Sequence, residues 1–180
     1  MVLSKIANFL RSATTRIDIL SAAAPVAGQV LTATGDSAAT WQTPGYPSNF
    51  KAWQNGNQAM AGTATTKVTL NAEVYDDNSD FDATTNYRFV APVDGTYHFD
   101  ASIGLEGYTA RFVLLLYLDG AEKIRFVDAN GISGTGSNVA GSTTLKMTAG
   151  QYVELFLYHA GAVTTTGQLN YTTLCGYRVK

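Results

Sequence analysis

Strict alternation of apolar and polar side chains is the feature that most constrains the fold of this chain. Between Thr96 and Ile103 every second residue is apolar, so one face of this segment is apolar and the other is polar. Such a period of two is typical of an antiparallel strand with one face in a core and the other in water. Asp-Gly and Asn-Gly dipeptides, which favour tight turns, follow similar segments at positions 94–95, 119–120 and 130–131. Since no amphipathic helix pattern appears after residue 50, we predict an all-β fold, an antiparallel β-sandwich of the jelly-roll type.

The composition excludes several classes of function. Hydrophobic residues make up 46% of the 180 residues, which is enough for a buried core, while charged residues make up only 14%. The net charge is −2 and no basic stripe is present, so we expect no nucleic-acid partner. The single cysteine, Cys175, excludes an internal disulfide framework and a cysteine-ligated metal cluster. No apolar run reaches the roughly 18–20 residues that span a bilayer, and Asn8 and Arg11 interrupt the first apolar stretch, so we expect neither membrane insertion nor a secretory signal.

The first 45 residues follow a different pattern, and we predict an attachment and shaft segment at 1–45 and a knob at 46–180. Apolar residues recur at alternating spacings of three and four, as in the seam of a short trimeric coiled coil. The seam residues are Leu3, Ile6, Leu10, Ala13, Ile17 and Leu20. Residues 14–19 also alternate like a strand, and an unstructured leader is a third alternative. Residues 21–44 are rich in small side chains and predict two short strands that turn at Gly35 and Asp36.

Two segments are apolar on both faces, and this pattern predicts self-association. They run from Phe112 to Leu118 and from Tyr152 to Tyr158, and only Glu154 interrupts them. In an antiparallel sandwich one face of each strand meets the core, so a second apolar face requires a second burial surface. A partner subunit is the simplest such surface, and loops of the same chain are the alternative. We therefore predict a trimer interface that contains Leu114, Leu116, Tyr117, Leu155, Phe156 and Tyr158.

Residues 49–180 carry a series of short motifs in a characteristic order. Phe89–Phe99 has the form F-x-x-P-x-x-G-x-Y-x-F, Leu116–Gly120 has the form L-x-x-D-G, and Cys175–Tyr177 closes the series. In this order the motifs resemble the tumour necrosis factor-like superfamily, in particular the globular head of complement component one q. The resemblance implies a jelly roll that assembles as a tight homotrimer with three-fold symmetry. Gln151 stands where that family usually has aspartate, and no collagen repeat precedes the domain.

A second resemblance lies in the first part of the chain. Gly28 is followed by the letters QVLTATGD, and residues 38–41 form an Ala/Thr-Trp ending. This segment resembles a motif that recurs in phage tail-fibre and other virion appendage proteins. Together with the missing collagen repeat, it implies a bacteriophage version of the fold, located in the virion.

Chemically active groups are few. No metalloprotease, serine-hydrolase or phosphate-loop motif is present. His98 and Asp100 have the spacing of a base and its orienting carboxylate, but we interpret them as an exposed polar pair on a strand, and we expect no catalytic residues. The acidic cluster at 76–82 offers oxygen ligands to a hard cation, with a solvated turn as the alternative. The candidate calcium ligands are Asp76, Asp77 and Asp80, and no other cofactor is expected.

The sequence therefore predicts a non-enzymatic structural protein of a phage particle, such as a fibre, spike or capsid decoration, with a trimeric knob that mediates host-surface attachment. The expected partners are other copies of the chain, other virion proteins at the N-terminal segment, and a host cell-surface glycan or protein at the long loops 128–142 and 159–168. One alternative is a bacterial secreted or spore-surface adhesin with the same fold. The other is a virion-associated glycan-degrading enzyme, which requires paired carboxylates in a groove.

Overall fold

The computed structural model of the chain describes residues 18–19, 29–35, 38–42, 47–106, 110–130 and 137–179. The chain divides into two compact units, Met1–Gly45 and Tyr46–Lys180. Within the described ranges every regular element is a strand, and no helix there is able to cross a membrane. The predicted coiled-coil seam lies outside the described residues at all of its positions: Leu3, Ile6, Leu10, Ala13, Ile17 and Leu20.

The first unit contains a small three-stranded sheet. Its strands are β1 (Asp18–Ile19), β2 (Val30–Gly35) and β3 (Ala38–Gln42), in the order β1-β3-β2. β2 and β3 form an antiparallel hairpin, as the small-residue segment predicts, and β1 pairs with β3 in parallel. Leu31 pairs with Trp41 across the hairpin and remains 36% exposed, because so small a sheet has little interior.

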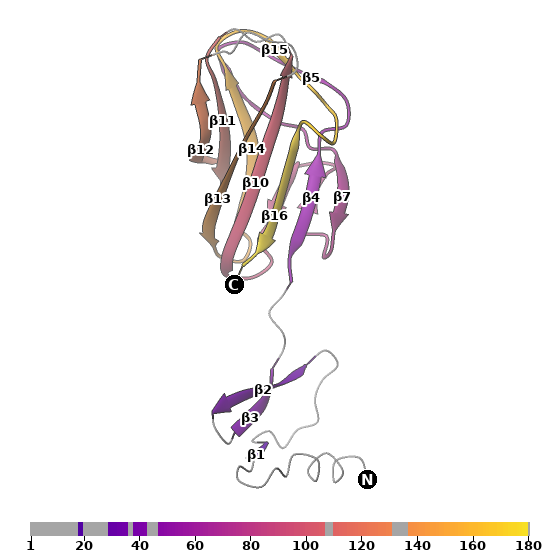
Figure 1. Ribbon diagram of the computed structural model, residues 1–180, viewed down its shortest axis with the longest axis vertical. Helices are drawn as coiled ribbons and strands as arrows, with labels where there is room; N and C mark the ends of the chain where they lie inside the picture. The colour runs from indigo at the N-terminus through magenta and orange to yellow at the C-terminus, as the bar shows by residue number, and fades with distance from the viewer. Residues whose placement is uncertain are drawn as a thin grey trace. The chain divides into compact units, whose positions relative to one another are not determined.

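The second unit is a sandwich of two sheets (Figure 1). The first sheet has the order β5-β15-β10-β16-β4-β7, and β13 pairs with the other edge of β10. Its strands are β4 (Asn49–Trp53), β5 (Gln58–Met60), β7 (Ala72–Asp76), β10 (Gly95–Glu106), β13 (Ser137–Met147), β15 (Val163–Thr165) and β16 (Thr173–Arg178).

The second sheet has the order β12-β11-β14-β9-β8, and β6 pairs with β14 beside β9. Its strands are β6 (Ala64–Lys67), β8 (Phe81–Asp82), β9 (Arg88–Val90), β11 (Phe112–Leu118), β12 (Ala121–Ala129) and β14 (Tyr152–His159). Every pairing in this unit is antiparallel. The prediction of an all-β antiparallel sandwich is therefore confirmed.

The core lies between the two sheets and is filled by the inward residues of each strand. Phe50 of β4 stacks on Phe89 of β9 with ring centroids 4.8 Å apart, and such a pair contributes about 0.5–1.5 kcal/mol beyond the area it buries. The Tyr97 hydroxyl donates to the Val93 carbonyl at 2.6 Å, so its polar end is satisfied inside the core. The alternation of β10 places the predicted residues inward: Tyr97, Phe99, Ala101 and Ile103.

Candidate interaction surfaces

The outer face of the second sheet carries the apolar side chains that required a second burial surface. We call it the covered face, and it consists of Val113, Leu115, Tyr117, Phe156 and Tyr158. Val113 and Leu115 are only 3% and 2% exposed in the single chain. Cross-strand register explains this burial, because Leu115 lies between Arg125 of β12 and Phe156 of β14.

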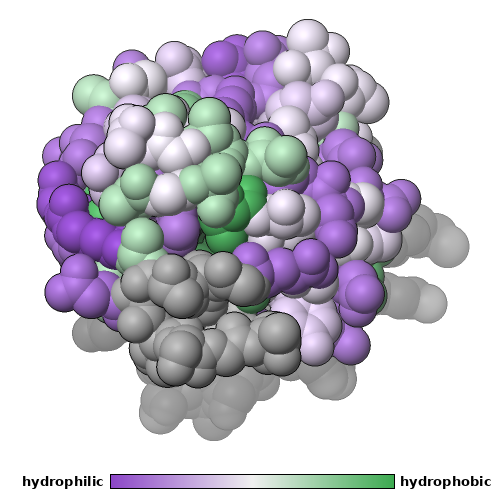
Figure 2. Space-filling view, turned by 90° about the horizontal axis from the view of Figure 1, so that it is seen from above, coloured by the Kyte–Doolittle hydropathy of each residue, from purple (hydrophilic) through white to green (hydrophobic). Residues whose placement is uncertain are grey.

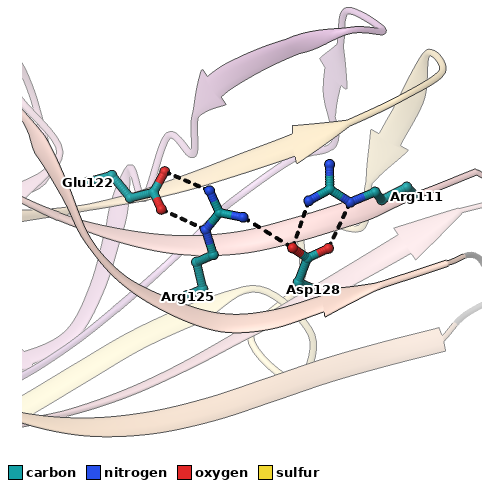
Figure 3. A network of polar contacts seen from close by, with 4 residues as sticks. All are labelled: Arg111, Glu122, Arg125 and Asp128. Atoms are coloured by element: carbon teal, nitrogen blue, oxygen red, sulfur yellow. Dashed lines mark hydrogen bonds and ion pairs between the residues drawn. The ribbon is translucent and has the colours of Figure 1, made fainter.

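A network of charged side chains extends over the β11–β12 side of the covered face (Figure 3). Arg111 donates to Asp128 through Nε at 2.8 Å and Nη2 at 2.6 Å. Arg125 donates to Glu122 at 2.6 Å and to the same Asp128 at 3.1 Å. The Arg111 guanidinium also lies 5.6 Å from the centre of the Tyr158 ring. Long arginine side chains lay their methylene groups over apolar surface while the charge stays in water. The chain's own strands therefore supply the side chains that cover Val113 and Leu115.

The structure divides the predicted interface residues into two groups. Tyr117 and Phe156 stack with centroids 4.1 Å apart and are half-buried on the covered face, together with Tyr158. The three leucines lie in the core within one chain, with no exposed surface, so their assignment to a subunit interface is corrected: Leu114, Leu116 and Leu155. Alternation separates the two groups onto opposite faces, but because both faces of these strands are apolar, the sequence could not tell which face meets the core.

The outer face of the first sheet is different, and we call it the open face. It consists of the outward residues of β13, β10, β16, β4 and β7. Tyr177 of β16 and Tyr75 of β7 are 49% and 42% exposed there. Between β13, β10 and β16 the side chains are small and leave a shallow hollow of about 350 Å³. The hollow is lined by Asp100, Ala101, Ser102, Ala140, Gly141, Ser142 and Thr173.

The open face also holds the His98 and Asp100 pair. The His98 Nε2 lies 3.1 Å from the Asp100 carboxylate, and the His98 ring packs on Tyr177 with centroids 5.2 Å apart. Cys175 faces Asp100 across the strand pair. Burial raises the pKa of the Cys175 thiol, and the Asp100 charge raises it further, which disfavours the reactive thiolate. The Asp100 side chain is 53% exposed, so this group is a polar strand pair in open solvent.

The acidic segment at 76–82 is a turn whose carboxylates bond to the chain itself. The Asp76 carboxylate accepts from the N–H groups of Asp80 at 3.1 Å and Phe81 at 2.7 Å. Asp80 accepts from the Ser48 hydroxyl at 2.7 Å, and Asp77 accepts from the Asn49 amide. Burial raises the pKa of Asp80. No three His, Cys, Asp or Glu side chains among the described residues are arranged to hold a metal ion, so the predicted calcium site at Asp76, Asp77 and Asp80 is not supported.

Two loops cross closely at the end of the second unit where β4 ends and β16 begins. The Gly56 N–H donates to the Gly167 carbonyl at 3.2 Å, and the Gly167 N–H donates to the Asn57 side chain at 2.9 Å. Beneath them the buried Gln54 amide donates to Thr165 at 2.8 Å. The sequence drew attention to 159–168 as a long loop but not to residues 54–57. One sequence feature could have indicated both loops: residues 52–66 and 160–177 contain no Asp, Glu, Lys or Arg.

Comparison with known proteins identifies the second unit. Residues 50–179 match the family model of the C1q domain, which covers well over half of the chain. The chain belongs to the C1q domain family. Among solved structures, the C1q domain is similar to the globular domain of zebrafish complement 1qA protein, with a TM-score of 0.55 and 18% identity over 74% of this chain and 98% of that one. It is also similar to murine APRIL, with a TM-score of 0.60 and 12% identity over 74% of this chain and all of that one. The predicted tumour necrosis factor-like fold is confirmed, and the matching family is not one of enzymes.

Two curated relatives come from Bacillus subtilis (strain 168). The phage-like element PBSX protein XkdV is 29% identical over 152 residues, which are 69% of this chain and 22% of XkdV. The uncharacterized protein YqcC is 35% identical over 100 residues, which are 52% of this chain and 27% of YqcC. The C1q-domain chain thus matches about a quarter of the length of each relative.

Proposed function

We propose that this C1q-domain chain is a subunit of a homotrimeric, non-enzymatic structural protein of a phage particle. The observation that carries the proposal is the likeness to a phage-like element protein, which extends over 69% of the chain. The β2–β3 hairpin supports it, because its sequence resembles virion appendage proteins. In this proposal the first unit attaches to other virion proteins, and the C1q unit is a knob that contacts the host surface.

The trimer contact lies on the open face. This face exposes large rings at Tyr75 and Tyr177, whereas the covered face already buries its aliphatic residues under charged side chains. The small residues around the hollow allow a second backbone to approach closely. Aromatic side chains and a low density of charge are typical of the centre of a stable interface. The interface predicted from the doubly apolar strands is thereby moved to the other sheet.

The mass of the particle in solution tests the trimer and its location. We expect the wild-type chain to have three times the chain mass of 19.2 kDa in light scattering. Tyr177→Glu on the open face should give a folded species of lower mass, because a buried unpaired charge opposes association. Lys123→Glu, an exposed residue of β12, is the matched control and should remain trimeric. A monomeric wild type, or a trimeric Tyr177→Glu, contradicts this part of the proposal.

The place of the protein in the particle requires its own test. Mass spectrometry of purified particles should detect the chain, and antibody against residues 46–180 should label the particle surface in electron microscopy. Particles that lack the chain would contradict the virion assignment. Incubation of the protein with capsular polysaccharide should leave the polymer length unchanged, and depolymerisation would contradict the non-enzymatic role.

A further inference from the structure

We infer that the loop end of the C1q unit binds a neutral, hydroxyl-rich polymer, an uncharged glycan, through two crossed loops. This inference rests on the proposed attachment function and names the chemistry of its partner. We call the surface the amide loop pair, and it consists of Asn55, Asn57, Gln168, Leu169, Asn170 and Tyr171. It lies at the end of the C1q unit where β10 ends and β16 begins.

The two loops that form the amide loop pair carry no charged side chain. Residues 52–66 and 160–177, which include both loops of the pair, contain no Asp, Glu, Lys or Arg. Figure 2, a view onto the end that carries β5 and β15, shows apolar residues gathered beside hydrophilic ones. One charge touches the pair, the Glu106 carboxylate at the end of β10, which accepts from the Asn57 amide at 3.2 Å. A polyanion is recognised through lysine and arginine side chains, and the amide loop pair has none.

The exposed groups of the pair match a sugar. Asn55, Gln168 and Asn170 are exposed, and each side-chain amide has two donors and an acceptor, as a sugar hydroxyl both donates and accepts. The exposed Asn57 amide instead bonds to Glu106 and to the Gly167 N–H and so holds the pair together. Leu169 is 39% exposed and provides apolar contact for the C–H groups of a ring. A second observation lies beside Tyr171 of the pair. The Thr166 side chain packs next to Tyr171 over Gly104 of β10, it is more than nine-tenths buried, and its hydroxyl has no hydrogen-bond partner among the described residues.

The pair is also held rigid before any ligand arrives. Gly56 and Gly167 bond to each other through their backbones at 3.2 Å. The Thr172 hydroxyl donates to the Thr166 carbonyl at 2.8 Å, and the Gln54 N–H donates to the Thr172 carbonyl at 3.0 Å. Loops that are ordered in the free protein lose less entropy on binding, so weak amide contacts suffice when three copies act together.

The decisive experiment places each sign of charge at one exposed position of the full-length protein. Binding is measured by interferometry to a neutral glucan, mannan and galactan and to two polyanions, polyglycerol phosphate and hyaluronate. A neutral ligand gains no attraction from a charge on the protein. Gln168→Lys and Gln168→Glu should therefore both lower the affinity about ten-fold, because binding must remove water from the new ion in either variant. For a polyanion the two variants would instead act in opposite directions. Lys123→Ala is the control and should keep wild-type affinity and mass.

Salt separates the same two ligand classes. Binding to at least one neutral polymer should change less than about two-fold between roughly 50 mM and 500 mM NaCl, because screening acts only on charges. Binding only to the polyanions, opposite effects of the two Gln168 variants, or no binding to any neutral polymer overturns the inference. Adsorption of the protein to intact host cells is measured in parallel. Adsorption without neutral-polymer binding leaves the attachment function standing and removes only the glycan, whereas no adsorption removes both.

Discussion

Substitution of Gly167 tests whether the close contact between the two backbones at the loop crossing requires a glycine at this position. A Cβ atom at this position would lie 1.9 Å from the Gly56 carbonyl oxygen, so Gly167→Ala forces the two backbones apart. Separation breaks the Gly56 to Gly167 bond and the Gly167 to Asn57 bond, at about 1 kcal/mol each. Strain from the inserted methyl group adds about 1–3 kcal/mol. We therefore expect Gly167→Ala to lower the free energy of unfolding by about 3–5 kcal/mol.

Gly56→Ala provides the matched control in the same crossing. Gly56 has a φ of +91° and no atom within 4 Å of a Cβ there, so alanine meets only backbone strain of about 1–2 kcal/mol. Urea unfolding followed by circular dichroism measures both variants at one protomer concentration, because association is linked to stability. With a slope of about 2 kcal/mol per molar urea, Gly167→Ala should lower the midpoint by roughly 1.5–2.5 M. A midpoint shift no larger than that of Gly56→Ala would refute the steric reasoning.

Three further variants test single interactions. Lys67→Met leaves the Glu154 carboxylate, which is 7% exposed, without its ion-pair partner at 2.5 Å, and should lower the free energy of unfolding in urea by about 2–3 kcal/mol. Adding Glu154→Gln should recover most of that loss, and failure to do so would contradict the pairing. Tyr97→Phe removes the buried bond to the Val93 carbonyl and should cost about 1–2 kcal/mol, while an unchanged melting temperature would argue against it. Hydrogen bonds from backbone N–H groups lower the pKa of Asp82 in the folded protein. Its ionised form therefore stabilises the fold at pH values above the ordinary carboxyl pKa, and this stabilisation is lost as the pH falls through the folded-state pKa. The stability difference between wild type and Asp82→Ala should therefore be constant above about pH 5 and shrink below about pH 4, and a difference that grows in acid would be inconsistent.

The sandwich was predictable because its signals are local. The alternation at β10 depends only on the period of two that every extended strand has, and it placed Tyr97 and Phe99 in the core as predicted. The motifs from Phe89 to Tyr177 then indicated the C1q-type fold, which the family model and the solved structures confirm. The structure does not support the predicted calcium site, and the reason is equally local: the Asp76 carboxylate bonds to backbone N–H groups four and five residues away.

The sequence by itself determined the alternating strand β10 with its inward face, the two doubly apolar strands and the low charge of two long segments, because these depend on residue order alone. Only the tertiary structure decided what covers the second apolar face. Two register shifts between β11 and β12 bring Arg125 beside Leu115 and Asp128 beside Val113, and no pattern within one strand contains that information. The same holds for the amide loop pair. Its two loops are joined by the bond between Gly167 and Asn57, which lie 110 residues apart, and they meet only because β4 and β16 are neighbours in one sheet.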